Sequence, residues 1–518
     1  MSALKHASRG GLIADTNEWT FELIERYNTE IGLLADEFEL DTYPNQIEII
    51  RSEQMLDAYA SIGMPLGYNH WSFGKHFVEV EQNYQRGHMG LAYEIVINSD
   101  PCIAYLMEEN TLTMQALVIA HACYGHNSFF KNNYLFRSWT DAGSIVDYLV
   151  FAKQYIARCE EQHGIAEVEQ ILDSCHALMN YGVDRYKRPD PISPEEEKRQ
   201  QREREEYVQR NLNDLWRTLP EAREQISEDI ARFPAEPQEN LLYFIEKNAP
   251  LLEPWQREIV RIVRKLGQYF YPQRQTQVMN EGWASFWHYT LLQGLYDRKL
   301  VSDGFMLEFL TSHTSVLTQL PFDHPGYNGI NPYALGFAIF SDLRRVCEAP
   351  TDEDREWFPH IAGGNWLEVL HAAMRDYKDE SFIQQYLSPK VMRDLKLFGV
   401  VDDDEQDHIL VEAIHNRTGY RELRQLLASQ YNVGDKEPNI QVVDVNLRGD
   451  RSLTLKHTQF ERRPMGQDTE DVLRHVYRLW KFPVKLDSVW ANETVASFKV
   501  PRDGSGRTDK LPGMPGTV

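Results

Sequence analysis

The chain has 518 residues, of which 42% are hydrophobic and 25% charged, so it can form two to four domains with sizeable cores. Its 78 acidic and 54 basic residues give a formal net charge of −24, which argues against general nucleic-acid binding because a phosphate backbone would be repelled. No apolar run reaches the roughly 18 residues of a membrane span, and the N-terminus lacks the apolar core of a secretory signal.

Five cysteines are scattered along the chain, and no two of them form a Cys-x-x-Cys pair. This pattern favours a reducing compartment, without a disulfide framework or a thiolate zinc cluster. We therefore expect a cytoplasmic protein.

The first 190 residues are expected to be mainly helical. Apolar residues at three- and four-residue steps predict one helix over 18–38 and, after a turn, a second over 47–59. Residues 91–98 are rich in β-branched side chains and predict a short strand. Further helices are expected at residues 112–124, with Gly125 bending or ending the helix, and at residues 144–163 and 168–181.

Residues 187–211 separate the two halves of this helical region. Ser193 and Pro194 begin a capping box, and the run that follows is almost wholly charged. The segment is either a solvated helix or a mobile linker, and a spacer without chemistry accounts for it.

The second half continues as helices and then changes character near residue 400. We expect helices at residues 241–270, 277–294, 336–348, 420–431 and 468–480, strands at residues 440–446, 452–458 and 484–490, and a loop at residues 324–332.

The predicted fold is thus a mainly α-helical N-terminal domain with a short β element, plus a small α+β C-terminal domain. The expected parts are residues 1–190 and 212–400 for the helical core, 191–211 for the linker, 401–501 for the C-terminal domain and 502–518 for a disordered tail.

Two short segments hold the most informative chemistry. Residues 121–126 (His-Ala-Cys-Tyr-Gly-His) place His121 and His126 in an apolar stretch. In an ideal α-helix five steps separate the two rings by about 140°, so they converge only if Gly125 bends the backbone. The alternative is two histidines with ordinary hydrogen-bond partners, one buried and one at a helix end.

The second segment, residues 280–288, places Glu281 and His288 seven residues apart among aromatic side chains. Seven helical steps return to within ~20° of the start, so both side chains share one face. A carboxylate in such surroundings needs a strong partner, which could be a metal ion, a buried ion pair or hydrogen bonds to the neighbouring aromatic side chains. His121, His126, Glu281 and His288 are therefore the candidate metal ligands. Zinc is favoured, and iron or manganese also suits mixed histidine and carboxylate ligands.

Other polar residues are candidates for catalysis or substrate binding. Glu94, on its apolar strand, is the candidate general base because burial would raise its pKa, although a structural salt bridge would also explain it. His70, Lys75 and His76 lie among aromatic residues and are candidate substrate contacts, with Lys75 suited to an anionic group. The two histidines could instead bind the metal or support its ligands. His324 is another, although a histidine in a loop is more often a turn residue.

Four segments carry a family resemblance: residues 32–48, 63–75, 120–130 and 279–288. They resemble the stage V sporulation protein R (SpoVR) family, and the resemblance runs over nearly the whole chain. It implies a role in forming the spore cortex, a peptidoglycan layer. For members from bacteria that do not sporulate, it implies association with a serine kinase of the PrkA type and a part in stress or stationary-phase physiology.

Two of these segments are also similar to helical zinc peptidases. In those enzymes a His-Glu helix ending in Gly-His and a downstream Glu-Gly-Trp-Ala segment supply the ligands. Gly125 and His126 match the first segment, and residues 281–284 match the second. The chain departs from the pattern at Ala122, where those peptidases have the glutamate that activates water.

The leading hypothesis is a cytoplasmic metal-dependent hydrolase of an amide or peptide bond, with a peptidoglycan-related bond as one candidate target. A regulatory scaffold that acts with a PrkA-type kinase is the main alternative, and an iron or manganese redox protein is the third. No phosphate-binding loop, dinucleotide fingerprint or Gly-x-Ser-x-Gly elbow is present in the sequence.

Overall fold

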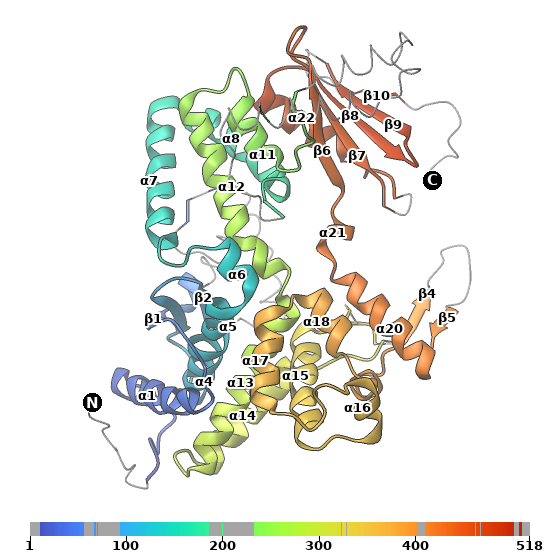
Figure 1. Ribbon diagram of the computed structural model, residues 1–518. Helices are drawn as coiled ribbons and strands as arrows, with labels where there is room; N and C mark the ends of the chain where they lie inside the picture. The colour runs from blue at the N-terminus through green and yellow to red at the C-terminus, as the bar shows by residue number, and fades with distance from the viewer. Residues whose placement is uncertain are drawn as a thin grey trace. The chain divides into compact units, whose positions relative to one another are not determined.

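The computed structural model describes residues 11–55, 67–68, 70, 94–185, 199, 233–322, 324–327, 329–401, 410–460, 463–466, 468–501 and 507–509. The chain divides into two compact units, the first from Met1–Ala157 and Tyr269–Val433 and the second from Arg158–Gln268 and Gly434–Val518 (Figure 1). Helices predominate, and the C-terminal region carries strands and helices together. The predicted fold class is therefore confirmed.

Most elements of the first unit are helical. They are α1 (Phe21–Glu37), β1 (Asn45–Ile50), β2 (Glu94–Ile97), β3 (Cys102–Met107), α4 (Leu112–Val118), the π-helix η1 (Ile119–His126), α5 (Asn127–Asn132), α6 (Tyr134–Trp139), α13 (Gln277–Asp297), α14 (Asp303–Val316), α15 (Pro332–Glu348), α16 (Asp352–Trp357), α17 (Trp366–Asp376), α18 (Asp379–Tyr386), α19 (Pro389–Asp394), β4 (Gly399–Val401), β5 (Leu410–Ala413) and α20 (Arg417–Gln430). Two long helices, α7 (Ile145–His163) and α12 (Pro254–Arg274), each run from one unit into the other.

Helix α13 is the centre of the first unit. Its buried side chains lie on every side of the helix, with Trp283 and Trp287 among the largest fully buried residues in the described chain. A helix that is apolar all round must be enclosed by other elements. Accordingly, η1, α15, α1 and α14 pack around it.

The first unit also contains a three-stranded sheet in the order β1-β3-β2. Strand β1 pairs with β3 in parallel, and β2 pairs with β3 antiparallel. The helix predicted over 47–59 is therefore wrong at its start, because residues 45–50 alternate between more and less exposed positions and hydrogen-bond to β3. Strand β3 was not predicted from the sequence pattern. The strand predicted over 91–98 is confirmed at Glu94–Ile97.

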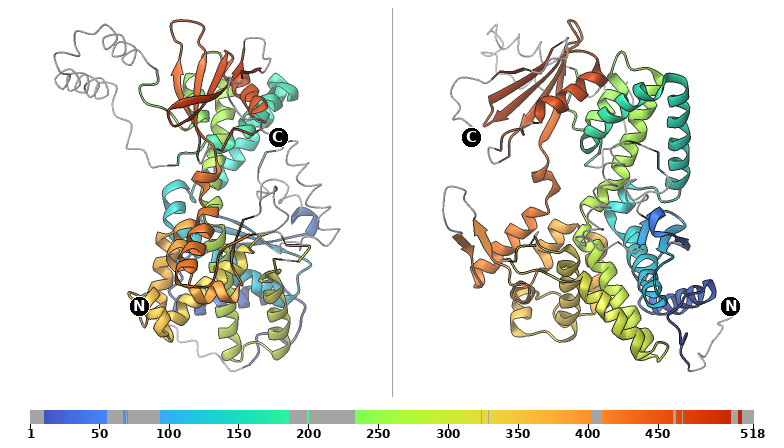
Figure 2. Two further views of the ribbon diagram at one scale, coloured as in Figure 1. Left: turned by 90° about the vertical axis from the view of Figure 1, so that its right-hand side faces the viewer. Right: turned by 180° about the vertical axis from the view of Figure 1, so that it is seen from behind.

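The second unit is built on a five-stranded sheet in the order β10-β9-β8-β7-β6. Its elements are α8 (Ile165–Ala177), the 3₁₀ turn η2 (Met179–Tyr181), α11 (Leu241–Asn248), α21 (Val433–Lys436), β6 (Asn439–Val445), β7 (Leu453–Thr458), α22 (Thr469–Trp480), β8 (Val484–Trp490), β9 (Glu493–Val500) and β10 (Arg507–Asp509). The predicted hairpin is confirmed as β6 and β7, which pair antiparallel. Helix α22 packs on β8, β9 and α8 (Figure 2).

This division differs from the boundaries expected at residues 190 and 400. The sheet and α22 pack with α8 and α11 from the middle of the chain, so the second unit is assembled from two distant segments. Most of the predicted linker and of the predicted tail lies outside the described residues, but residues 507–509 form β10 on the edge of the sheet. Among the described residues, no helix is long and apolar enough to cross a membrane.

Candidate metal centre

The two histidines of the first segment meet because the backbone there is a π-helix. Hydrogen bonds from residue i to residue i+5 place side chains five apart near one another, unlike an α-helix. The His121 and His126 rings lie 4.5 Å apart between centroids and are perpendicular. The expected break at Gly125 is wrong, since the helical path continues directly into α5.

Gly125 serves a different purpose. A Cβ atom there would lie 2.6 Å from the Ala284 Cα atom, so only glycine lets η1 lie directly against α13. Gly282 of α13 likewise lies against Gly336 of α15, where an added Cβ would come within 2.4 Å of backbone atoms. Glu281 lies three residues before Ala284 on α13. These close approaches therefore bring it next to His121 and His126.

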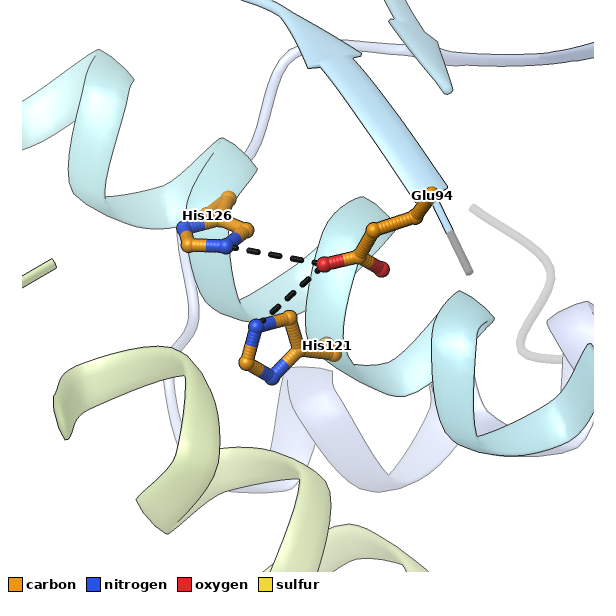
Figure 3. A group of neighbouring side chains, drawn as sticks. All are labelled: Glu94, His121 and His126. Carbon is orange, nitrogen blue, oxygen red and sulfur yellow. Dashed lines mark ion pairs between the residues drawn. The ribbon is translucent and has the colours of Figure 1, made fainter. Parts of the chain in front are cut away.

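Four side-chain atoms from three elements converge in the interior (Figure 3 draws three of these residues). Glu94 Oε1 lies 3.3 Å from His121 Nε2 and 3.7 Å from His126 Nε2. Glu281 Oε2 lies 3.7 Å and 3.5 Å from the same two nitrogens. The histidine side chains are 7–8% exposed and the carboxylates 16–20%, so the cluster is largely shielded from water. We call these four residues the His–Glu cluster.

The spacing within the His–Glu cluster fits a metal ion better than direct pairing. Charge-assisted hydrogen bonds between nitrogen and a carboxylate are about 2.7–2.9 Å long, shorter than any of the four separations. Ligand atoms at about 2.0–2.1 Å from a tetrahedral metal ion lie about 3.3 Å from one another. In addition, Glu281 Oε2 is buried and makes no hydrogen bond within the described part of the chain. The ligand atoms of Glu94, His121 and His126 all lie within 4.8 Å of one another. Two imidazoles with a carboxylate close to both suit zinc, iron or manganese.

Burial and neighbouring charges together set the protonation of the cluster. It raises the pKa of Glu94 to about 7, with Glu281 adding to the rise and His121 opposing it. Burial also lowers the pKa of His126 to about 4, so this imidazole is neutral at physiological pH and can donate a lone pair. For Glu281, the nearby His126 and His121 outweigh burial and lower the pKa, so this carboxylate is ionised.

The far nitrogens of both histidines have partners that set the ring tautomers. His126 Nδ1 lies 3.0 Å from Asn280 Oδ1, an acceptor, so Nδ1 carries the proton and Nε2 faces the carboxylates with a lone pair. His121 Nδ1 lies 2.8 Å from His288 Nδ1, and His288 Nε2 lies 2.6 Å from His313 Nδ1. When His121 Nδ1–H donates to His288 Nδ1 and His288 Nε2–H donates to His313 Nδ1, His121 Nε2 keeps its lone pair and can bind a cation.

Three of the four expected metal ligands come together in the structure. His121, His126 and Glu281 meet as expected, and Glu94 joins them. His288 contacts the cluster through the far nitrogen of His121 and does not face the carboxylates, because its own two ring nitrogens hydrogen-bond His121 Nδ1 and His313 Nδ1.

Two of the four expected substrate contacts, His70 and His324, lie within the described residues. His70 is buried. His324 is exposed and accepts a hydrogen bond from the Gly326 backbone at 3.0 Å, as a turn residue does. Lys75 and His76 lie outside the described residues.

Asn280 and His313 are not among the residues that the sequence pattern predicts for the site. The only signal for Asn280 was a polar residue directly before Glu281 in an apolar helix. His313 lies four residues after Phe309, on the buried side of α14, where a histidine also has a purely structural explanation.

Two family models match the chain, one described as SpoVR like protein over residues 18–436 and one as SpoVR-like C-terminal domain over residues 438–491. The chain belongs to the SpoVR family. The resemblance that its motifs predicted is thereby confirmed, and the whole His–Glu cluster lies within the first SpoVR match.

This SpoVR-family chain is also similar to a protein of Escherichia coli (strain K12). It is 65% identical over 476 residues to "Uncharacterized protein YcgB", a match that covers 92% of this chain and 93% of that protein. No solved structure matches the chain.

Proposed function

We propose that this SpoVR-family protein is a zinc-dependent hydrolase of amide or peptide bonds. In this proposal His121, His126 and Glu281 hold the metal ion, and Glu94 is the general base. The observation that carries it is the spacing of the His–Glu cluster, where each of two carboxylate oxygens lies 3.3–3.7 Å from both histidine nitrogens, longer than a charge-assisted hydrogen bond and near the separation of two ligands around one ion.

The packing favours this division of roles. His121, His126 and Glu281 lie on η1 and α13, which are locked together where Gly125 meets Ala284. Glu94 comes from a separate element, the edge strand β2. A catalytic zinc site keeps three protein ligands and one position for water, so the carboxylate outside the rigid pair of helices is the one expected beside that water.

The residues then have distinct tasks in hydrolysis. A bound zinc ion would supply a Lewis acid and lower the pKa of water. Glu94 takes a proton from the attacking water and delivers it to the leaving nitrogen. Asn280 and His288 hold the two imidazoles in the orientation and tautomer that a ligand requires.

The class of substrate is proposed from the family. Its association with the spore cortex makes peptides and amides derived from peptidoglycan precursors the first compounds to test, followed by ordinary peptides. His70, Lys75, His76 and His324 stay candidate substrate contacts, and their substitution is expected to raise KM more than it lowers kcat.

Elemental analysis of the purified protein tests the metal centre. We expect close to one metal ion per chain in the wild type, and loss of that ion with retained folding in Glu281→Gln and in His126→Ala. Glu25→Gln, which removes an exposed carboxylate on α1, is the matched control and is expected to keep the metal. Retention of stoichiometric metal in Glu281→Gln would overturn the ligand assignment.

The same measurement separates the alternatives. A wild-type protein without metal, even after anaerobic purification and reconstitution, would favour the scaffold that acts with a PrkA-type kinase. Bound iron with redox-sensitive absorbance would favour a redox protein. If zinc is bound, Glu94→Gln should keep the metal and lose hydrolysis, by about 10²-fold or more.

A further inference from the structure

We propose a second ligand site in the first unit, for a small phosphate monoester. The site is a surface hollow of about 340 Å³, lined by Arg417, Arg421 and Arg424 of α20, Glu356 and Trp357 of α16, and Gln384 of α18. A volume of this order is typical of small-molecule sites. We call it the arginine hollow. It uses no residue of the His–Glu cluster and does not depend on the proposed hydrolase activity.

The three arginines reach one hollow because of their spacing on α20. They stand at positions i, i+4 and i+7, which share one face of an α-helix. Their guanidinium groups thus lie near one another in a chain whose net charge is −24. Like charges held together are unfavourable, and an anion between them would offset the repulsion.

Only one of the three arginines has an acidic partner in the described part of the chain. Arg417 lies 2.6 Å from Glu356, and both side chains are more than half exposed, so this pair contributes little. Neither Arg421 nor Arg424 forms an ion pair with a described residue. Because Arg417 and Glu356 neutralise each other, the hollow presents about two uncompensated positive charges.

Arg424 has a structural explanation that Arg421 lacks. The Arg424 guanidinium stacks 4.7 Å from the Trp357 ring centroid and donates to the Leu387 carbonyl at 2.9 and 2.6 Å, at the C-terminal end of α18. Arg421 lies 6.0 Å from the same ring and makes no hydrogen bond within the described residues. Its five donors are therefore available to a ligand.

Phosphate is the anion that this arrangement suits best. A guanidinium group binds phosphate through two parallel hydrogen bonds, and two such groups can bind different oxygens of one dianion. The amide of Gln384 supplies a further donor at the wall. Arg424 keeps its charge at neutral pH, since burial and the neighbouring Arg421 lower its pKa only to about 10.

Isothermal titration calorimetry of the full chain with inorganic phosphate and with phenyl phosphate tests the proposal. We expect both probes to bind the wild type at constant ionic strength. Arg421→Gln should weaken the binding about tenfold, the loss of one charge-assisted contact. Arg421→Lys should weaken it less, and Glu356→Gln should strengthen it by removing the opposing carboxylate. The matched control is Arg344→Gln, which removes a partly exposed arginine of α15 that pairs with Glu348.

A phosphate ion could also bind a metal in the His–Glu cluster, and the variants separate the two sites. Binding at the metal would be unchanged in Arg421→Gln and lost in Glu281→Gln. The arginine hollow predicts the reverse. Wild-type affinity for both probes in Arg421→Gln, or no binding to the wild type, would overturn the proposal.

Discussion

At the scale of single residues, the His–Glu cluster depends on which nitrogen of each imidazole faces the carboxylates. Asn280 accepts from His126 Nδ1, and this fixes the lone pair on Nε2. The same contact holds the His126 ring in place against Phe130, and the centroids of these two stacked rings lie 5.8 Å apart. Asn280 therefore sets the orientation of His126 Nε2, the candidate ligand atom, without touching that atom itself.

Replacement of Asn280 tests this dependence. Asn280→Ala removes the acceptor and should lower the affinity for zinc about 10- to 100-fold, the usual effect of losing such a partner. Competition with a chromogenic chelator measures the change. Asn280→Asp keeps an acceptor for His126 Nδ1 and should retain most of the affinity. Equal affinity in the alanine variant and the wild type would contradict the role.

At the scale of elements, the cluster depends on how closely η1, α13 and α15 approach one another. Their contacts run through Gly125, Gly282 and Gly336, where a methyl group would meet backbone atoms of the neighbouring helix. Backbone atoms cannot rotate aside as a side chain does, so the helices themselves would have to move.

Gly282→Ala is expected to destabilise the protein by about 1–3 kcal/mol, as overpacking of a filled interior does, and to lower metal affinity through displacement of Glu281. Urea denaturation and chelator competition measure the two effects. Gly304→Ala on α14 is the matched control. Its added Cβ has no neighbour nearer than 3.7 Å, so no loss is expected. Equal stability of the two variants would contradict the packing argument.

Helix α16 depends on the buried carboxylate of Asp354. Thr351 caps the N-terminus of α16 and forms a capping box with Asp354 in the first turn. Arg345 of α15 donates two hydrogen bonds of 2.7 Å to Asp354. Despite burial, which raises it, the pKa of Asp354 falls to about 2 because Arg345 and Thr351 bind the charged form.

The pH dependence of this contribution has a definite sign. Because the folded pKa lies below the unfolded value of 3.8, Asp354 stabilises the fold above about pH 4 and loses this effect as the pH falls toward 2. Asp354→Asn should cost about 2 kcal/mol at pH 7 and progressively less below pH 4. Asp352→Asn, on the exposed side of the same helix, should cost a few tenths of that. Urea denaturation across this pH range checks the prediction, which a pH-independent difference would contradict.

At the scale of the whole molecule, the His–Glu cluster belongs entirely to the first unit. A ligand that binds only the folded form stabilises it by RT ln(1 + [L]/Kd), about 4 kcal/mol at a thousandfold excess over Kd. A bound metal ion would therefore raise the free energy of unfolding of this unit.

Differential scanning calorimetry of chelator-treated protein tests this coupling. Added zinc should raise the midpoint of the transition that contains the first unit, and Glu281→Gln should abolish the shift. A variant of the second unit, Asp487→Asn, should keep it. A wild-type midpoint that does not respond to zinc, iron or manganese would contradict the metal centre.

Sequence periodicity predicted most of the long helices and the C-terminal hairpin, because their apolar spacing is a local property. It also singled out His121, His126 and Glu281, since polar ligands in apolar helices are rare enough to need an explanation. It failed at residues 45–50, where three isoleucines fit a helix or a strand and hydrogen bonding to β3 decides between them.

The sequence alone thus determined the residue types of the candidate centre, the helices that carry them and the family. Only the tertiary structure decided that Glu94, rather than His288, reaches the two histidine nitrogens. It also decided that a π-helix, rather than a bend at Gly125, brings the histidines together. The reason is physical: helical periodicity is set by neighbours within a few residues, whereas these contacts join segments more than 150 residues apart through close packing of helix backbones.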